Sequence, residues 1–109
     1  MSRHHVHARL DGHQVLVVAG YDRPLRELFL QVLSDDGDPQ AEEVVLYSSM
    51  HESQRDWRDF DTLTQALAEL GLTLPAGMLD AIRGDQVLNA GNRMVVHHFD
   101  QPPELLLAG

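Results

Sequence analysis

Apolar and polar residues alternate over positions 5–10, which is the pattern of a β-strand with one buried face. The pair Asp11-Gly12 follows, and Asp-Gly favours the two-residue turn of a β-hairpin because both central residues need a positive φ. We therefore predict a hairpin with strands near 4–10 and 13–19. In this register three pairs share one mostly apolar face: Val6 with Val17, Ala8 with Val15, and Leu10 with His13.

Residues 25–34 fit two kinds of element. Their apolar residues recur at helical spacing, but the run Leu28–Leu33 also has the length of a buried strand. The later segment 43–47 is rich in β-favouring residues, and its backbone N–H and C=O groups need a strand to pair with. We therefore predict a strand within 25–34 that pairs with 43–47 through a loop at 35–42, with a helix over 25–34 as the alternative.

Two helices are predicted next. The first carries apolar residues at i, i+3, i+4 and i+7, on one side of a helix: Leu63, Ala66, Leu67 and Leu70. Asp59 or Asp61 can accept its first free N–H groups, and Gly71 can end it in the left-handed conformation. The second helix has Pro75 at its first position and ends near Gly84. Its inward residues are Met78, Leu79 and Ile82.

A last strand is predicted over 93–99, so the element order is β-β-β-β-α-α-β. This order is typical of the α+β class: a two-layer domain with an antiparallel sheet of about five strands and two helices packed on one face. The length of 109 residues fits one domain, which we place at 1–99, followed by a C-terminal tail at 100–109.

The charge of the chain narrows the classes of partner. Seventeen acidic residues against eight basic ones give a net charge of −9, which disfavours nucleic acids and anionic membranes and favours a basic protein partner. All eight basic residues are arginine, a bias that indicates a GC-rich bacterial coding sequence. No signal-peptide stretch and no apolar run long enough to cross a bilayer is found, so we expect a cytoplasmic protein.

Catalytic motifs are missing from the sequence. Without lysine or cysteine, Schiff-base chemistry and thiol nucleophiles are excluded. Neither a nucleophile elbow (G-x-S-x-G) nor a glycine-rich phosphate or dinucleotide loop is present. We therefore expect a protein that is not an enzyme and that needs no cofactor.

Histidine is abundant, with seven residues in the chain. His5 and His7 lie two positions apart, so on a strand both imidazoles project from one face and can offer two nitrogens to a transition metal. A stable site needs a third ligand. His97 and His98 are adjacent and point to opposite faces, so at most one of them can join the first pair.

Three features are candidates for partner binding. The first is the turn with Tyr21, Asp22 and Arg23, either an exposed recognition cluster or an internal Asp–Arg tie. The second is Trp57, either a lid on the core or an interface anchor. The third is the apolar pair Leu105 and Leu106 in the tail, which must pack on this domain or on another chain.

These observations predict a small, acidic, non-enzymatic protein-interaction or regulatory module. Its expected partner is a protein, either a basic one or a second copy in a homodimer. The alternative is a protein that binds a small molecule or a transition metal through the His-rich N-terminal hairpin.

Overall fold

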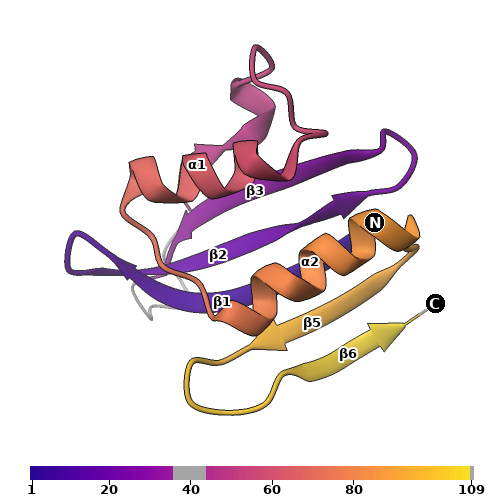
Figure 1. The fold of residues 1–109 in the computed structure, drawn as a ribbon. Coiled ribbons are helices and arrows are strands. Elements are labelled where there is room, and N and C mark those ends of the chain that lie inside the picture. The colour runs from indigo at the N-terminus through magenta and orange to yellow at the C-terminus, as the bar shows by residue number, and fades with distance from the viewer. Residues whose placement is uncertain (36–43, 109) are drawn as a thin grey trace.

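The computed structural model describes residues 1–35 and 44–108 and has two layers, a six-stranded sheet and a pair of α-helices that both lie on one face of it (Figure 1). This confirms the α+β class. The strands are β1 (Ser2–Leu10), β2 (His13–Asp22), β3 (Glu27–Ser34), β4 (Val45–Ser48), β5 (Arg93–His97) and β6 (Glu104–Ala108). The helices are α1 (Phe60–Leu70), α2 (Ala76–Leu88) and a short 3-10 turn, η1 (Ser49–His51).

The strands lie in the order β4-β3-β2-β1-β5-β6. The sheet is mixed rather than wholly antiparallel, because β5 runs parallel to β1 while every other neighbouring pair is antiparallel. It has six strands rather than about five. The sixth comes from the segment 100–109, which we expected to form a tail and which contributes β6 at the edge of the sheet.

The predicted hairpin is confirmed in its turn and in its register. Asp11 and Gly12 have φ values of 51° and 81°, so both central residues occupy the left-handed region that this turn requires. β1 and β2 pair as predicted: Val6 with Val17, Ala8 with Val15, and Leu10 with His13. The turn therefore determines which side chains of the first two strands reach the core.

The ambiguous segment 25–34 forms a strand, as preferred. β3 pairs with β2 along its whole length, and its buried residues alternate towards the helices: Leu28, Leu30 and Val32. β4 pairs with β3 on the other side, with a register shift between Val32 and Leu33. Of the predicted loop at 35–42, all residues after Asp35 lie outside the described part of the chain.

Both helices begin and end on recognisable residues. Asp59 caps α1 by accepting a hydrogen bond from the Asp61 backbone, and Gly71 ends it with a φ of 76°. α2 starts after Pro75, which serves as its N-cap residue rather than its first helical residue. It continues to Leu88, one turn beyond the predicted end at Gly84, because one glycine only weakens a helix and Asn89 supplies the left-handed cap.

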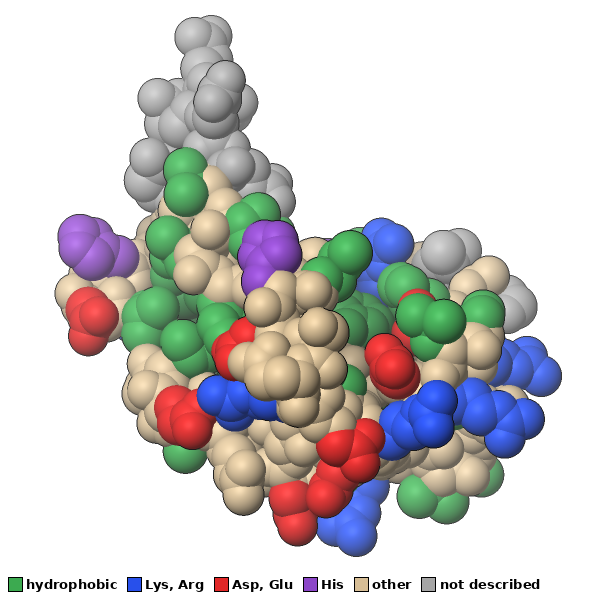
Figure 2. All heavy atoms as spheres, turned by 90° about the horizontal axis from the view of Figure 1, so that it is seen from above, with side chains coloured by type: hydrophobic (Ala, Val, Ile, Leu, Met, Phe, Trp, Pro, Cys, Tyr) green, Lys and Arg blue, Asp and Glu red, His purple; other side chains and the backbone are tan. Residues whose placement is uncertain are grey.

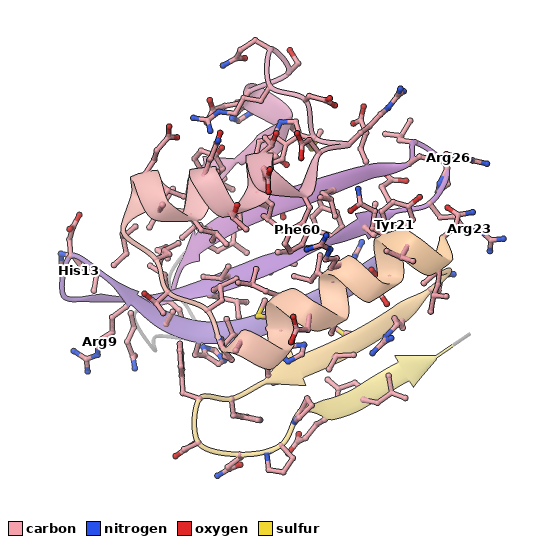
Figure 3. All side chains as sticks on the ribbon, in the orientation of Figure 1. Arg9, His13, Tyr21, Arg23, Arg26 and Phe60 are labelled. Carbon is pink, nitrogen blue, oxygen red and sulfur yellow. The ribbon has the colours of Figure 1, made fainter. Side chains whose placement is uncertain are left out.

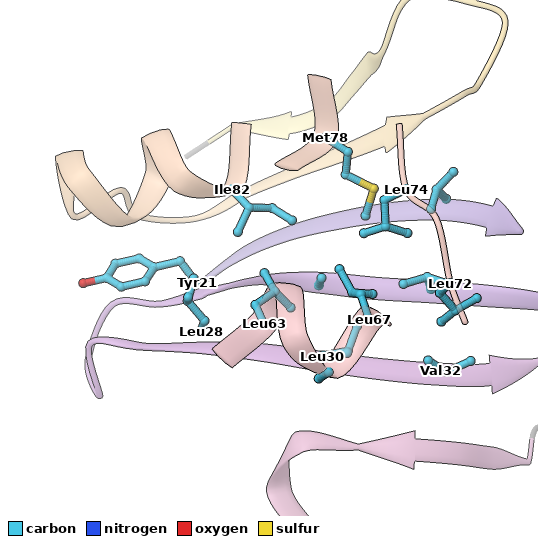
Figure 4. Packing of buried hydrophobic residues seen from close by; sticks show 14 of the residues in the cluster. Tyr21, Leu28, Leu30, Val32, Leu63, Leu67, Leu72, Leu74, Met78 and Ile82 are labelled. Carbon is cyan, nitrogen blue, oxygen red and sulfur yellow. The ribbon is translucent and has the colours of Figure 1, made fainter. Parts of the chain in front are cut away.

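The core lies between the sheet and the helices (Figure 4). Leu63 and Leu67 of α1 and Met78 and Ile82 of α2 point at buried strand residues such as Leu30. Each fully buried aliphatic side chain of this kind stabilises the fold by about 1.5–3 kcal/mol. α1 packs on β3 and α2 on β1 and β2, so one face of the central strands is closed.

Glycine substitutions test this packing. An added Cβ at Gly20 would lie 2.1 Å from the Ser2 carbonyl oxygen on β1, whereas one at Gly84 of α2 would meet nothing within 4 Å. We expect Gly20→Ala to destabilise the fold by roughly 1–3 kcal/mol. Gly84→Ala should stabilise it by about 0.5–1 kcal/mol through helix propensity. Urea unfolding followed by Trp57 fluorescence measures both, and equal effects of the two substitutions would contradict the close approach at Gly20.

Candidate functional site

Among residues 1–35 and 44–108, no helix lies on the second face of the sheet, which we call the open face. Because side chains alternate along a strand, the residues between the core positions of β1, β2 and β3 point to this face. They are Arg3, His5, His7 and Arg9 on β1, Leu16 and Val18 on β2, and Phe29, Gln31 and Leu33 on β3. The open face therefore carries a row of basic and imidazole groups beside a mostly apolar area.

A cavity of about 610 Å³ lies on the open face over β1, β2 and β3. Its floor is apolar and includes Leu16, Val18 and Phe29. Its rim is formed by Leu25 of the β2–β3 turn and Met50 of η1, both exposed. Figure 2 looks onto the β4 edge of the sheet rather than onto the open face, and at this edge hydrophobic side chains lie in several patches between charged ones. Cavities of 300–1,000 Å³ with mainly apolar walls are the usual sites for small ligands.

Two polar groups of β1 reach this cavity without a partner among the described residues. The Nε2 atom of His5 is buried and makes no hydrogen bond. The exposed Arg3 forms no ion pair with a described residue. Burial, and then the positive charge of Arg3, lowers the pKa of His5, so its imidazole is neutral at pH 7. A ligand with a complementary polar group would satisfy both side chains.

A chain of buried polar side chains lies on the helix-covered face beneath α2. His4 Nε2 is 2.6 Å from Asp85 Oδ2, and His4 Nδ1 is 2.8 Å from His97 Nε2. Arg93 donates to the other oxygen of Asp85 at 3.0 Å. These contacts connect β1, α2 and β5, so they dock the second helix on the parallel strand pair.

The charge of the buried Asp85 side chain and the pKa of the His97 side chain follow from their hydrogen bonds and burial. Burial raises the pKa of Asp85, but hydrogen bonds from His4 and Ser2 and the charge of Arg93 outweigh it and hold the pKa below its usual value. The ionised carboxylate only accepts, so His4 donates through Nε2. The Nδ1 atom of His4 and the Nε2 atom of His97 share one hydrogen bond. Burial, with the nearby charges of His4 and Arg93, lowers the pKa of His97 to about 4.

The sequence reasoning missed this buried chain, although two signals could have revealed it. Asp85 lies seven residues after Met78 and three after Ile82, on the inward side of α2, but the predicted end at Gly84 left it outside the helix. His4 lies two residues before Val6 on the first strand, so both side chains point to the apolar side. A charged and an imidazole side chain at two core positions are expected to pair with each other.

The predicted Tyr-Asp-Arg cluster is not jointly exposed. Tyr21 is only 3% exposed and donates a hydrogen bond to Asn89 at the end of α2. Asp22 accepts from the Leu25 backbone and shapes the turn. Figure 3 shows Arg23 and Arg26 at the outer end of the β2–β3 turn, whereas Tyr21 lies over the sheet. The expectation of an exposed Tyr21 is therefore wrong, because the side chain faces the helices.

Trp57 occupies the first of its two predicted roles, the lid on the core. Its side chain is 5% exposed, and its Nε1–H donates to the Glu52 carbonyl oxygen at 3.0 Å. Its own carbonyl oxygen accepts from the Leu28 backbone at the edge of β3. Leu105 and Leu106, in contrast, remain 60% and 57% exposed on β6, although the backbone of this strand pairs with β5.

The histidines proposed as metal ligands lie on one face of β1, as predicted. His7 contacts Asp35 at 2.8 Å, whereas His97 faces the opposite side of the sheet and pairs with His4. Within residues 1–35 and 44–108, no group of three or more His, Cys, Asp or Glu residues is arranged to hold a metal ion. The third ligand that the His5–His7 pair needs is therefore not supplied by these residues.

Acid should weaken the fold through His97. Its pKa is about 4 in the folded protein against 6.5 in a free side chain, so the unfolded chain binds the proton more readily. The stability from this group is complete above pH 6.5 and falls by about 3 kcal/mol as the pH drops to 4. His97→Gln offers His4 both a hydrogen-bond donor and an acceptor and does not titrate, so it should remove this pH-dependent component. Urea unfolding at several pH values measures it, with His13→Gln, exposed at the hairpin tip, as the control.

Metal addition tests the paired histidines. With two ligands and no third among the described residues, we expect one equivalent of Zn²⁺ or Ni²⁺ to leave the Tm unchanged. Thermal unfolding with and without metal, compared with His5→Ala and His7→Ala, measures this. A stoichiometric rise in Tm that these substitutions abolish would contradict the expectation and support a metal site.

Comparisons with protein families, with curated proteins and with solved structures gave no match. No helix in the described part of the chain has the length and apolar character to cross a membrane.

Proposed function

We propose that the protein is a non-enzymatic binding module that holds a small molecule in the cavity on the open face of its sheet. The ligand has an apolar body and a head group with acceptor oxygens, such as a carboxylate. The single observation that carries this proposal is the concave, mainly apolar cavity of about 610 Å³ beside two polar groups of β1, His5 and Arg3, that have no partner in the described part of the chain. It corresponds to the small-molecule alternative expected for the His-rich hairpin.

Apolar contact supports binding of the ligand body. Leu16, Val18 and Phe29 form a floor on the sheet, and strands that pair along their whole length make such a floor rigid. Leu25 and Met50 stand above it and lose exposed apolar area when a ligand enters. Burial of that area is favourable by about 25 cal/mol per Å².

The polar groups support a head group at β1. Arg3 offers only donors, and His5 offers a donor in the tautomer protonated at Nε2, so acceptor oxygens complement both. Asp22 and Glu27 also line the cavity, but they form the last pair of the β2–β3 ladder, whereas His5 lies opposite Val18 in the middle of β2. The head group therefore lies over His5 in the middle of β1, and Arg3, opposite Gly20 on β2, lies between His5 and Asp22.

The hydroxyl, imidazole and carboxyl groups that could take part in catalysis form hydrogen bonds within the fold, which supports a binding role rather than catalysis. Ser49 lines the cavity, and its Oγ accepts a hydrogen bond from the Leu30 backbone at 3.0 Å, which ties this hydroxyl to the β3 edge. His4, His97 and Asp85 are buried and bonded to one another on the opposite face.

The setting we propose is the bacterial cytoplasm. The chain contains no cysteine and therefore needs no oxidising compartment for disulfides. Its net charge of −9 disfavours nucleic acids and anionic membranes as partners. The protein-interaction function expected from the sequence is the second candidate, and the exposed leucines of β6 favour it.

Binding of 8-anilinonaphthalene-1-sulfonate tests the proposal, because this probe combines aromatic rings with a sulfonate. We expect one saturable site per folded chain by fluorescence and calorimetry. Phe29→Ala removes part of the floor and should raise Kd roughly tenfold. Arg3→Gln should weaken binding by a smaller factor, because Arg3 is exposed and its charge is screened.

Two substitutions, one at the rim of the cavity and one away from it, control for the general effect of adding a negative charge to the surface. Leu25 and Phe99 are both 59% exposed, but Leu25 lines the cavity and Phe99 does not. Leu25→Glu should weaken binding, and Phe99→Glu should leave it unchanged. The proposal fails if the folded protein shows no saturable binding, or if both substitutions have the same effect.

A further inference from the structure

An aromatic ring lies across the sheet in the floor of the cavity. Phe29 on β3 pairs with Gly20 on β2, and both positions belong to the open face. The tip of the ring, Cζ of Phe29, lies 3.1 Å from the point where a side chain at Gly20 would place its Cβ. The ring therefore extends along the sheet onto β2 rather than standing away from it, and it does so because residue 20 has no side chain.

A basic side chain completes the same cross-strand row. On its other side Gly20 pairs with Arg3 of β1, so Arg3, Gly20 and Phe29 form one row across three strands. Neighbouring strands lie about 4.8 Å apart. The ring spans the interval from β3 to β2, and one interval of the same size separates its tip from β1. Phe29 is half-buried and lines the cavity, so part of its ring is open to a ligand.

We propose that the ligand is an aromatic carboxylic acid whose carboxylate is attached to the ring directly or through a short link. This inference rests on the proposed function and names the class of ligand for the same cavity. The ligand ring packs against Phe29 over β2. Because only one strand interval then remains, a carboxylate close to the ligand ring reaches Arg3 on β1.

Contact with Phe29 favours a ring over an alkyl chain. Aromatic rings attract each other in edge-to-face and offset-stacked arrangements beyond the area that they bury, a gain that corresponds to roughly twofold to tenfold in affinity. An alkyl chain also loses rotational freedom when it is bound, whereas a fused ring system has none to lose. Two ligands that expose similar apolar area should therefore differ in affinity according to whether that area belongs to a ring.

The charged groups around the row favour a carboxylate at β1. Arg3 and His5 lie two residues apart on the same face of β1, so the two oxygens of one carboxylate can accept a hydrogen bond from each. Asp22 and Glu27 pair with each other in the next row towards the β2–β3 turn and also line the cavity. Their negative charges repel a carboxylate and direct it along β1 towards His5.

Two carboxylates that expose similar apolar area test the ring. 2-Naphthoate carries this area in two fused rings, and octanoate carries it in a flexible chain. By calorimetry at pH 7.5 we expect 2-naphthoate to bind at least about threefold more tightly. Phe29→Leu keeps an apolar side chain but removes the ring. It should weaken 2-naphthoate roughly threefold to tenfold and leave octanoate within about a factor of two.

A control variant and a neutral ligand complete the experiment. Phe99→Leu removes an exposed ring outside the cavity and should change the affinity for neither carboxylate. The uncharged 2-naphthamide should bind more weakly than 2-naphthoate. Arg3→Gln should weaken 2-naphthoate and leave 2-naphthamide unchanged, because only the carboxylate pairs with Arg3.

The outcomes separate this inference from the proposed function. If the unmodified protein binds octanoate as tightly as 2-naphthoate, or if Phe29→Leu weakens both equally, the aromatic class is wrong and the cavity remains a binding site. Saturable binding of 8-anilinonaphthalene-1-sulfonate without binding of 2-naphthoate overturns the inference in the same way. If none of these ligands binds, the proposed function fails and the inference fails with it.

Discussion

The hydrogen bond between His4 and Asp85 determines how the helix layer meets the sheet. A carboxylate buried without a partner is strongly unfavourable, so Asp85 is tolerated in the core only when α2 places it against His4 and Arg93. This requirement selects one position of α2 along β1, whereas apolar contacts alone tolerate small shifts of a helix. His97 extends the same chain to β5 and fixes the strand next to β1.

With both helices held on one face, the other features of the molecule follow. β1, β2 and β3 keep a free face, and its alternating residues bring Arg3 and His5 beside apolar side chains. The same strand thus has two different surfaces, since His4 faces a closed polar chain and His5 faces a cavity. His4 and His5 are adjacent in the sequence but have unrelated environments, because successive side chains of a strand point to opposite faces.

Local signals in the sequence were sufficient for the hairpin and for α1. Asp11-Gly12 specifies a turn and with it the register of the two strands. Asp59 and Gly71 mark the two ends of α1, whose apolar residues recur at helical spacing. The pattern of 25–34 alone fits a strand or a helix, and the need of 43–47 for a partner strand favours the strand, which the pairing of β3 with β4 confirms.

Features that depend on distant contacts were not predictable in the same way. The parallel pairing of β5 with β1 joins the two ends of the chain, and no local pattern encodes it. β6 follows two prolines and looked like a tail, because an edge strand needs only one partner and carries no clear alternation. For the open face, the sequence suggested the row of His5, His7 and Arg9 but not the cavity beside it, whose walls come from five separate segments of the chain.

The central place of β1 has a consequence for folding. This strand pairs locally with β2, but its other neighbour is β5, and the contact of His4 with His97 spans 93 residues of sequence. Closing so long a loop costs chain entropy before any contact compensates for it, which slows folding. During synthesis the hairpin can form early, yet the other edge of its first strand stays open until β5 has been synthesised.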